Sequence, residues 1–100
     1  MSRSADINAA LIAYLGYKRG DVPQTDWQAV VESIGMVHAE AVEIPMLGIL
    51  VDLRAIDPDW HIHSLWSGSE WAVRQLRKDH PDIDEGAAKA LVWAFSCEHK

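Results

Sequence analysis

The chain has 100 residues, of which 49% are hydrophobic and 24% are charged. This length accommodates one domain with a single core, and the hydrophobic content excludes an intrinsically disordered chain. Nine basic and fifteen acidic residues give a formal net charge of −6, which argues against a nucleic acid as the main partner, because nucleic-acid binding depends on clustered basic residues.

Helical spacing of the hydrophobic residues predicts helices along the whole chain and no convincing strand. We expect a first helix over about residues 4–15, capped by Ser4 and ended by Gly16. The stretch Thr25 to Gln28 matches a capping box, so a second helix should begin at Thr25 and stop near Gly35.

The third segment, about residues 37–56, contains Pro45. Proline inside a helix lacks the amide donor and clashes with the preceding turn, whereas it is tolerated at the first helical position. The sequence therefore favours a helix that restarts at Pro45, and leaves open one kinked helix. We expect this helix to be the central and most buried one.

Asp57 and Pro58 resemble the start of a fourth helix. It either runs unbroken to Asp79 or restarts at a second capping box near Ser67. His80, which precedes a proline, should end it. A fifth helix follows the acidic stretch 82–85, with its buried face formed by Ala87, Ala88, Leu91, Val92 and Phe95. The predicted fold is an all-α, compact bundle of four to five short helices in a single domain over residues 1–100.

Targeting and redox signals are weak. The hydrophobic stretch 9–17 has polar residues before it and Lys18 directly after it, which is not typical of a signal peptide. No run approaches the ~20 hydrophobic residues that span a membrane. The single cysteine, Cys97, cannot form a disulfide within the chain. We therefore expect a cytoplasmic protein that does not contact membranes.

Charge is distributed unevenly along the chain. Residues 21–59 hold eight acidic residues and one basic residue, a net charge of −7. A surface of one sign attracts a partner of the opposite sign, so this region predicts docking to a protein with a basic surface. The alternative is that these are solvated helix faces. The residues we expect at the docking surface are Glu40, Glu43, Asp52, Asp57, Asp59 and Trp60.

The five tryptophans are more than a chain of this size usually carries. Trp27 and Trp66 lie on predicted hydrophobic faces and should belong to the core. Trp71 and Trp93 lie off those faces, and Trp60 sits at a predicted helix start beside acidic residues. One or two of these three are candidates for an interface, where tryptophan is enriched, and the alternative is that all five fill the core. A homodimer through such aromatic surface is compatible with any of the functions considered.

Asp59, His61 and His63 alternate along the chain. In an extended segment their side chains would project from one side and suit zinc or another divalent ion. On a helix, residues two apart point in different directions and this cluster would dissolve. Since a helix is predicted here, the metal hypothesis is the weaker one.

Catalytic signals are few, and the sequence favours a protein that is not an enzyme. Cys97 is followed by Glu98, which opposes formation of a thiolate. Glu40 and Glu43, three residues apart, are more typical of a solvated edge than of an acid–base pair. The glycines are scattered singly, so no phosphate-binding loop is indicated.

These observations favour a non-enzymatic protein-binding module, such as an inhibitor of the antitoxin or immunity kind or an adaptor. This comparison depends on size and charge only. No cofactor is required. The alternative is a domain that binds a metal or a small ligand through Asp59, His61 and His63, with His38 as a further candidate.

Overall fold

A computed structural model describes residues 3–99, and it confirms the all-α prediction. The helices are α1 (Arg3–Leu15), α2 (Trp27–Ile34), α3 (Met36–Arg54), α4 (Leu65–Asp79) and α5 (Glu85–Glu98). No strand occurs among these residues. The molecule is elongated and rather flat, with principal extents of 44 × 28 × 19 Å.

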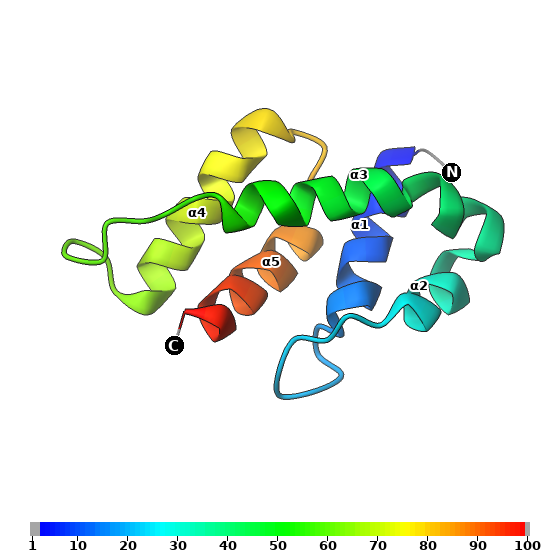
Figure 1. The fold of residues 1–100 in the computed structure, drawn as a ribbon, viewed down its shortest axis with the longest axis horizontal. Helices are drawn as coiled ribbons and strands as arrows, with labels where there is room; N and C mark the ends of the chain where they lie inside the picture. Colours follow the sequence, from blue (N-terminus) through cyan, green and yellow to red (C-terminus); the bar gives the residue numbers. More distant parts are fainter. Residues whose placement is uncertain (1–2, 100) are drawn as a thin grey trace.

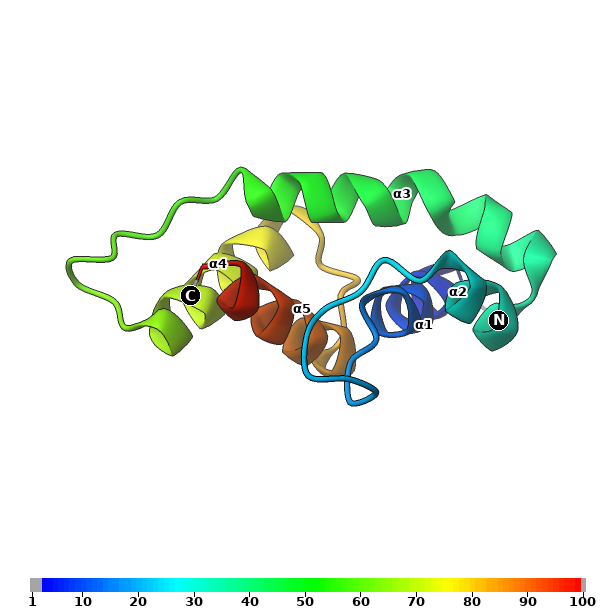
Figure 2. The ribbon, with the colours of Figure 1, turned by 60° about the horizontal axis from the view of Figure 1, so that its bottom comes forward.

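The long helix α3 crosses one side of the bundle, and the other helices pack beneath it. Figures 1 and 2 show α3 lying along the long direction of the molecule, with α1 and α2 under its N-terminal half, α4 and α5 under its C-terminal half, and the loop that follows it extending further out. α1 packs against α2, α3 and α5, whereas α3 contacts α1, α2 and α4. α3 is therefore covered on its inner side by the bundle and lies at the surface on its outer side.

Every helix contributes to one hydrophobic core. The largest fully buried hydrophobic side chains are Phe95, Leu11, Met46, Leu76, Leu91, Val30 and Val42. The buried face predicted for the fifth helix is confirmed, since Ala87, Ala88, Leu91, Val92 and Phe95 are all buried in α5. Burial of such side chains, at roughly 1.5–3 kcal/mol each, is the main term that holds the bundle together.

The helix ends follow local capping chemistry, with one correction. Gly16 ends α1 with a φ of 71°, as expected of a glycine at this position. The prediction that Thr25 caps the second helix is wrong by one residue. The Asp26 carboxylate accepts a hydrogen bond of 3.1 Å from the Ala29 amide, so Asp26 is the N-cap of α2. Aspartate caps helices somewhat better than threonine does.

The prediction that a helix restarts at Pro45 is also wrong. α3 is continuous from Met36 to Arg54 and contains Pro45 in its interior. Pro45 leaves the carbonyl of Ala41 without its intrahelical partner, but Ala41 is exposed and water can hydrate that carbonyl. The buried row formed by Ala39, Val42, Met46, Ile49 and Leu53 continues on both sides of the proline. Packing of this row offsets the lost hydrogen bond.

The start of the fourth helix differs from both predicted positions. α4 begins at Leu65, where the Ser64 hydroxyl accepts a hydrogen bond of 3.2 Å from the Ser67 amide. Residues 56–64 form a loop, because Trp60 turns inward and stacks on Phe95 at a centroid distance of 6.4 Å. A Cβ at Gly68 would lie 2.5 Å from the Trp60 ring, so Gly68 leaves room for the indole. The predicted end of this helix, at His80, is confirmed.

Candidate protein-binding surface

α3 carries hydrophobic side chains on its outer side as well as its inner side. Val37, Ile44 and Val51 are 79%, 81% and 63% exposed. They are spaced seven residues apart, two helical turns, and therefore form one row along the helix. Hydrophobic residues therefore lie on two opposite sides of α3, and an exposed row of this kind is a candidate for contact with another molecule.

A second row of small residues runs beside the first. Ala41, Gly48 and Ala55 also recur every seven residues, and each is exposed. Nothing lies within 4 Å of a Cβ built at Gly48, so this row is an open groove beside a ridge of branched side chains. We call the two rows together the outer face of α3, and its members are Val37, Ala41, Ile44, Gly48, Val51 and Ala55.

Charged residues border the outer face on both edges. Glu40, Leu47 and Arg54 follow one edge, and His38, Pro45 and Asp52 follow the other, again with seven-residue spacing. Each edge therefore carries one group of each sign when the histidine is protonated.

Several of these edge groups already have partners within the chain. His38 Nδ1 lies 2.9 Å from Asp6 Oδ2, and the His80 Nε2 atom lies 2.8 Å from Asp52 Oδ2. The guanidinium of Arg54 lies 3.4 Å from the Glu98 carboxylate. The side chains of His38, Asp52 and Arg54 are 53%, 60% and 66% exposed, so all three remain accessible beside the outer face.

A groove of about 460 Å³ adjoins the outer face on the Leu47 side. It lies between α3, the C-terminal half of α5 and the loop that follows α1, and Leu47 and Val51 belong to both the groove and α3. Val22, 62% exposed, forms part of its opposite wall. The hydrophobic surface of α3 thus continues sideways into a depression.

The six residues predicted to dock a basic partner do not share one face. Glu40 and Glu43 lie near one edge of α3, whereas Asp52 lies on the opposite edge. Asp57 and Asp59 are exposed in the loop after α3, and Trp60 is turned onto Phe95 with 38% of its surface exposed. Between the acidic edge residues the surface is hydrophobic.

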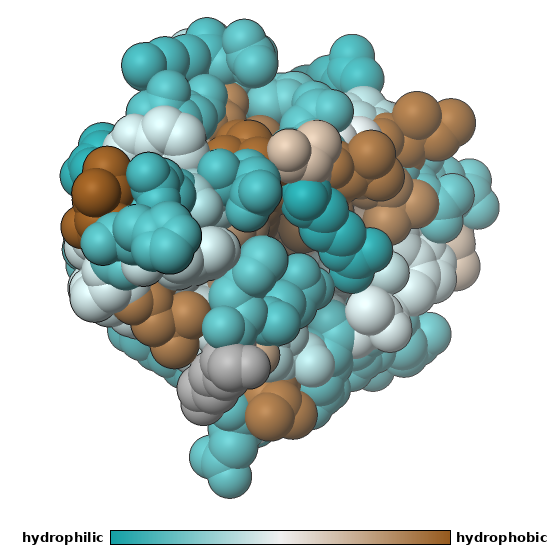
Figure 3. Space-filling view, turned by 60° about the vertical axis from the view of Figure 1, so that its left-hand side comes forward, coloured by the Kyte–Doolittle hydropathy of each residue, from teal (hydrophilic) through white to brown (hydrophobic). Residues whose placement is uncertain are grey.

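The tryptophans also differ from expectation. Trp66 is 55% exposed rather than part of the core. Trp27, Trp71 and Trp93 are partly buried against it. Figure 3 shows the end of the molecule near the C-terminus, where hydrophobic surface occurs in patches separated by polar residues. The exposed side chains of Ile62 and Trp66 belong to the loop after α3 and to α4.

The groups proposed to bind a metal point to separate partners. The Asp59 carboxylate accepts a hydrogen bond of 3.0 Å from the His61 amide, and His63 Nδ1 lies 2.8 Å from the Ser67 hydroxyl oxygen. His38 is held by Asp6. Among residues 3–99, no group of three or more histidine, cysteine, aspartate or glutamate side chains is arranged to hold a metal ion. The structure gives the metal alternative no support.

Comparison with known proteins identifies no relative. No family model, no curated protein and no solved structure matches the chain. Over the part of the chain that is described, no helix is long and hydrophobic enough to cross a membrane.

The outer face of α3 was absent from the sequence prediction, although its signal is present in the sequence. The row Val37, Ile44 and Val51 is visible as a seven-residue repeat of branched side chains. A second row, Ala39, Met46 and Leu53, has the same period and is buried. The two hydrophobic rows lie on opposite sides of one helix, one in the core and one exposed.

Proposed function

We propose that this protein is a non-enzymatic protein-binding module that docks its partner through the outer face of α3. The observation that carries this proposal is the row of Val37, Ile44 and Val51, exposed over two thirds of their surface on average, on a helix whose opposite side forms part of the core. Removing such a row from water is favourable, at about 25 cal/mol per Å².

The rest of the molecule supports a binding role more than a catalytic one. Cys97 is a free, half-buried cysteine at the end of α5. The lone cysteine fits a reducing compartment such as the cytoplasm. The net charge of −6 favours encounter with a basic protein, and the exposed loop residues Asp57 and Asp59 support this part of the proposal.

The proposal predicts that a bound protein is lost when charge is placed on the outer face. The double variant Ile44→Lys with Val51→Lys puts two ammonium groups where a partner must exclude water, so retention should fall about tenfold or more. The measurement is capture from a lysate of the expressing cells by the tagged protein, quantified by mass spectrometry. Washing with high salt then separates partners held by carboxylates, which are released, from those held by the hydrophobic row.

The matched control is Ile62→Lys, because Ile62 is 76% exposed but lies in the loop between α3 and α4. We expect this variant to retain the same protein as the unmodified chain. Equal retention by the α3 double variant, with its helicity unchanged by circular dichroism, would show that the docking surface lies elsewhere.

A further inference from the structure

We propose that the occupant of the outer face of α3 is the same face of a second copy of this chain, with the two α3 helices antiparallel. This inference rests on the proposed function and concerns the hydrophobic face only, since a second copy carries the same net charge of −6 and is not the basic protein that the loop acids Asp57 and Asp59 favour. It is carried by three features of the outer face: the alternation of large and small residues, the order of charges along one edge, and the position of Leu47 midway along that edge.

The two rows are complementary in shape when one copy is reversed. Val37, Ile44 and Val51 form a ridge, and Ala41, Gly48 and Ala55 form the groove beside it. In this pairing the two-fold axis is perpendicular to the helices at the level of residue 46. Two residues then face each other across the interface when their numbers add to 92. Ile44 then packs on Gly48 of the second copy. Ala41 likewise packs on its Val51. Every layer pairs one branched side chain with one small residue, which is the filling that close packing requires.

The same register brings opposite charges together. Glu40 and Arg54 are fourteen residues apart on one edge of the helix. After reversal, Glu40 lies within about 3 Å, along the helix axis, of Arg54 of the second copy. Symmetry repeats the pair, because an isologous interface uses each contact twice. Leu47 lies halfway between them and meets Leu47 of the second copy.

The opposite edge follows the same order. His38 and Asp52 are also fourteen residues apart, and reversal sets the imidazole of one copy near the carboxylate of the other. Both side chains are more than half exposed and are free to take a second partner. Pro45 lies between them and leaves the Ala41 carbonyl without an intrahelical donor, so this carbonyl has to keep a water molecule at the edge of the pair.

A parallel pair fits none of these features. In that arrangement Ile44 of one copy meets Ile44 of the other, and Gly48 meets Gly48. Layers with two large side chains then alternate with layers that leave a cavity, and a cavity in a packed interface is destabilising. In a parallel pair, a residue on one edge of the first helix lies beside a residue about five positions further along on the opposite edge of the second helix. Glu40 would therefore face Pro45 of the second copy instead of a basic group. The sequence of α3 therefore selects the antiparallel orientation.

The bend of α3 limits the contact to the middle of the helix. Figure 2 shows the N-terminal part of α3 curving toward α2, so its outer face is convex. The layers nearest the two-fold axis, formed by residues 41–51, approach most closely. Val37 and Ala55 lie at the ends and contribute less to the pairing.

Charge exchange at the edge tests this arrangement. In sedimentation equilibrium at about 100 μM protein, we expect the chain to show twice its 11.2 kDa mass. Glu40→Arg places two basic groups at each contact and Arg54→Glu places two acidic groups there, so each should weaken self-association about tenfold. Mixing the two variants restores opposite charges at both contacts and should restore the doubled mass. The double variant, which exchanges the charges within one chain, should recover it as well.

Three results would overturn the proposal. The first is that the unmodified chain stays monomeric at every concentration tested. The second is that the single variants associate as strongly as the unmodified chain, and the third is that the mixture of the two variants stays monomeric. Circular dichroism of each variant excludes unfolding as the cause. A monomeric chain that still retains another protein through α3 would leave the proposed function standing and remove only the self-pairing.

Discussion

We expect Phe95→Ala to lower the free energy of unfolding by about 3–5 kcal/mol, the largest effect of any single substitution considered. Phe95 is 1% exposed and lies on α5 beneath Trp60 and against His99, with a ring-centroid distance of 4.2 Å to the latter. Truncation removes core contacts and the platform for Trp60 together. Urea denaturation followed by tryptophan fluorescence measures the loss, which is a large fraction of the stability of a small domain.

Phe95→Leu is the matched control, because leucine keeps most of the buried volume. We expect it to cost about 1–1.5 kcal/mol. If the alanine variant lost less than about 1 kcal/mol, the C-terminal half of α5 would not be packed as described, and the groove that Phe95 lines beside α3 would be wrong as well.

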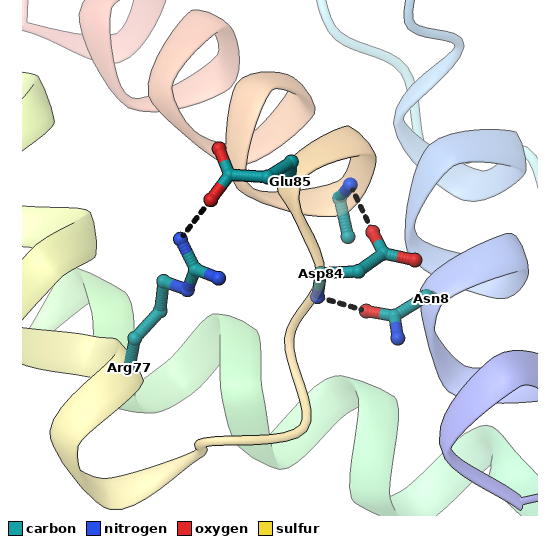
Figure 4. A network of polar contacts seen from close by, with 5 residues as sticks. Asn8, Arg77, Asp84 and Glu85 are labelled. Atoms are coloured by element: carbon teal, nitrogen blue, oxygen red, sulfur yellow. Dashed lines mark hydrogen bonds and ion pairs between the residues drawn. The ribbon is translucent and has the colours of Figure 1, made fainter.

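The second large effect should come from Asn8, a buried side chain that joins α1 to the turn before α5. Figure 4 shows its amide oxygen accepting a hydrogen bond of 3.0 Å from the Asp84 amide. Its amide nitrogen donates to the carbonyls of Ser4 and Asp82, each at 2.9 Å. Asn8→Ala leaves the Asp82 carbonyl and the Asp84 amide without these partners, so we expect a loss of about 2–3 kcal/mol in the free energy of unfolding.

The control for Asn8→Ala is Arg77→Ala, because Arg77 makes an exposed ion pair that is shown in the same figure. Arg77 donates to the Glu85 carboxylate at 3.1 Å, on the outside of the same turn. Because Glu85 is 80% exposed, the pair is screened by solvent, and Arg77→Ala should cost less than about 0.5 kcal/mol. Equal losses for the two variants would contradict the assignment of Asn8 as the residue that holds the turn.

Sequence reasoning predicted the helices well where hydrophobic period and capping chemistry agree. The run of small and branched residues in α5 appears in the sequence with its buried face in the right positions. His80 ends α4 as the residue before a proline should. Both features are local, so no knowledge of tertiary packing is needed to predict them.

Predictions failed where tertiary packing overrides local preference. Pro45 breaks an isolated helix, but α3 is held on both sides of it by Val42, Met46 and Ile49, which are buried against the bundle. Residues 56–64 have a proline and acids that resemble a helix start. They form a loop because Trp60 packs on Phe95, 35 residues further along the chain. No local pattern contains that contact.

The candidate site was missed for a related reason. A helix with hydrophobic residues on two opposite sides does not show from its sequence which side faces the core. Attention to charge placed the docking surface on Glu40, Glu43 and Asp52. In the structure Glu40 and Asp52 border a hydrophobic face rather than form an acidic one. Burial of Met46 and exposure of Ile44 distinguish the two sides.

Disulfide trapping between copies tests the central claim most directly. In a background of Cys97→Ser, the variants Ala41→Cys and Val51→Cys each place one thiol on the outer face of α3. In the antiparallel pair residue 41 meets residue 51 of the second copy, whereas two residues 41 lie about 15 Å apart along the axis. We predict that neither variant cross-links alone under mild oxidation and that an equimolar mixture does. Cross-linking of each variant with itself, or no cross-linking in the mixture, would contradict the account.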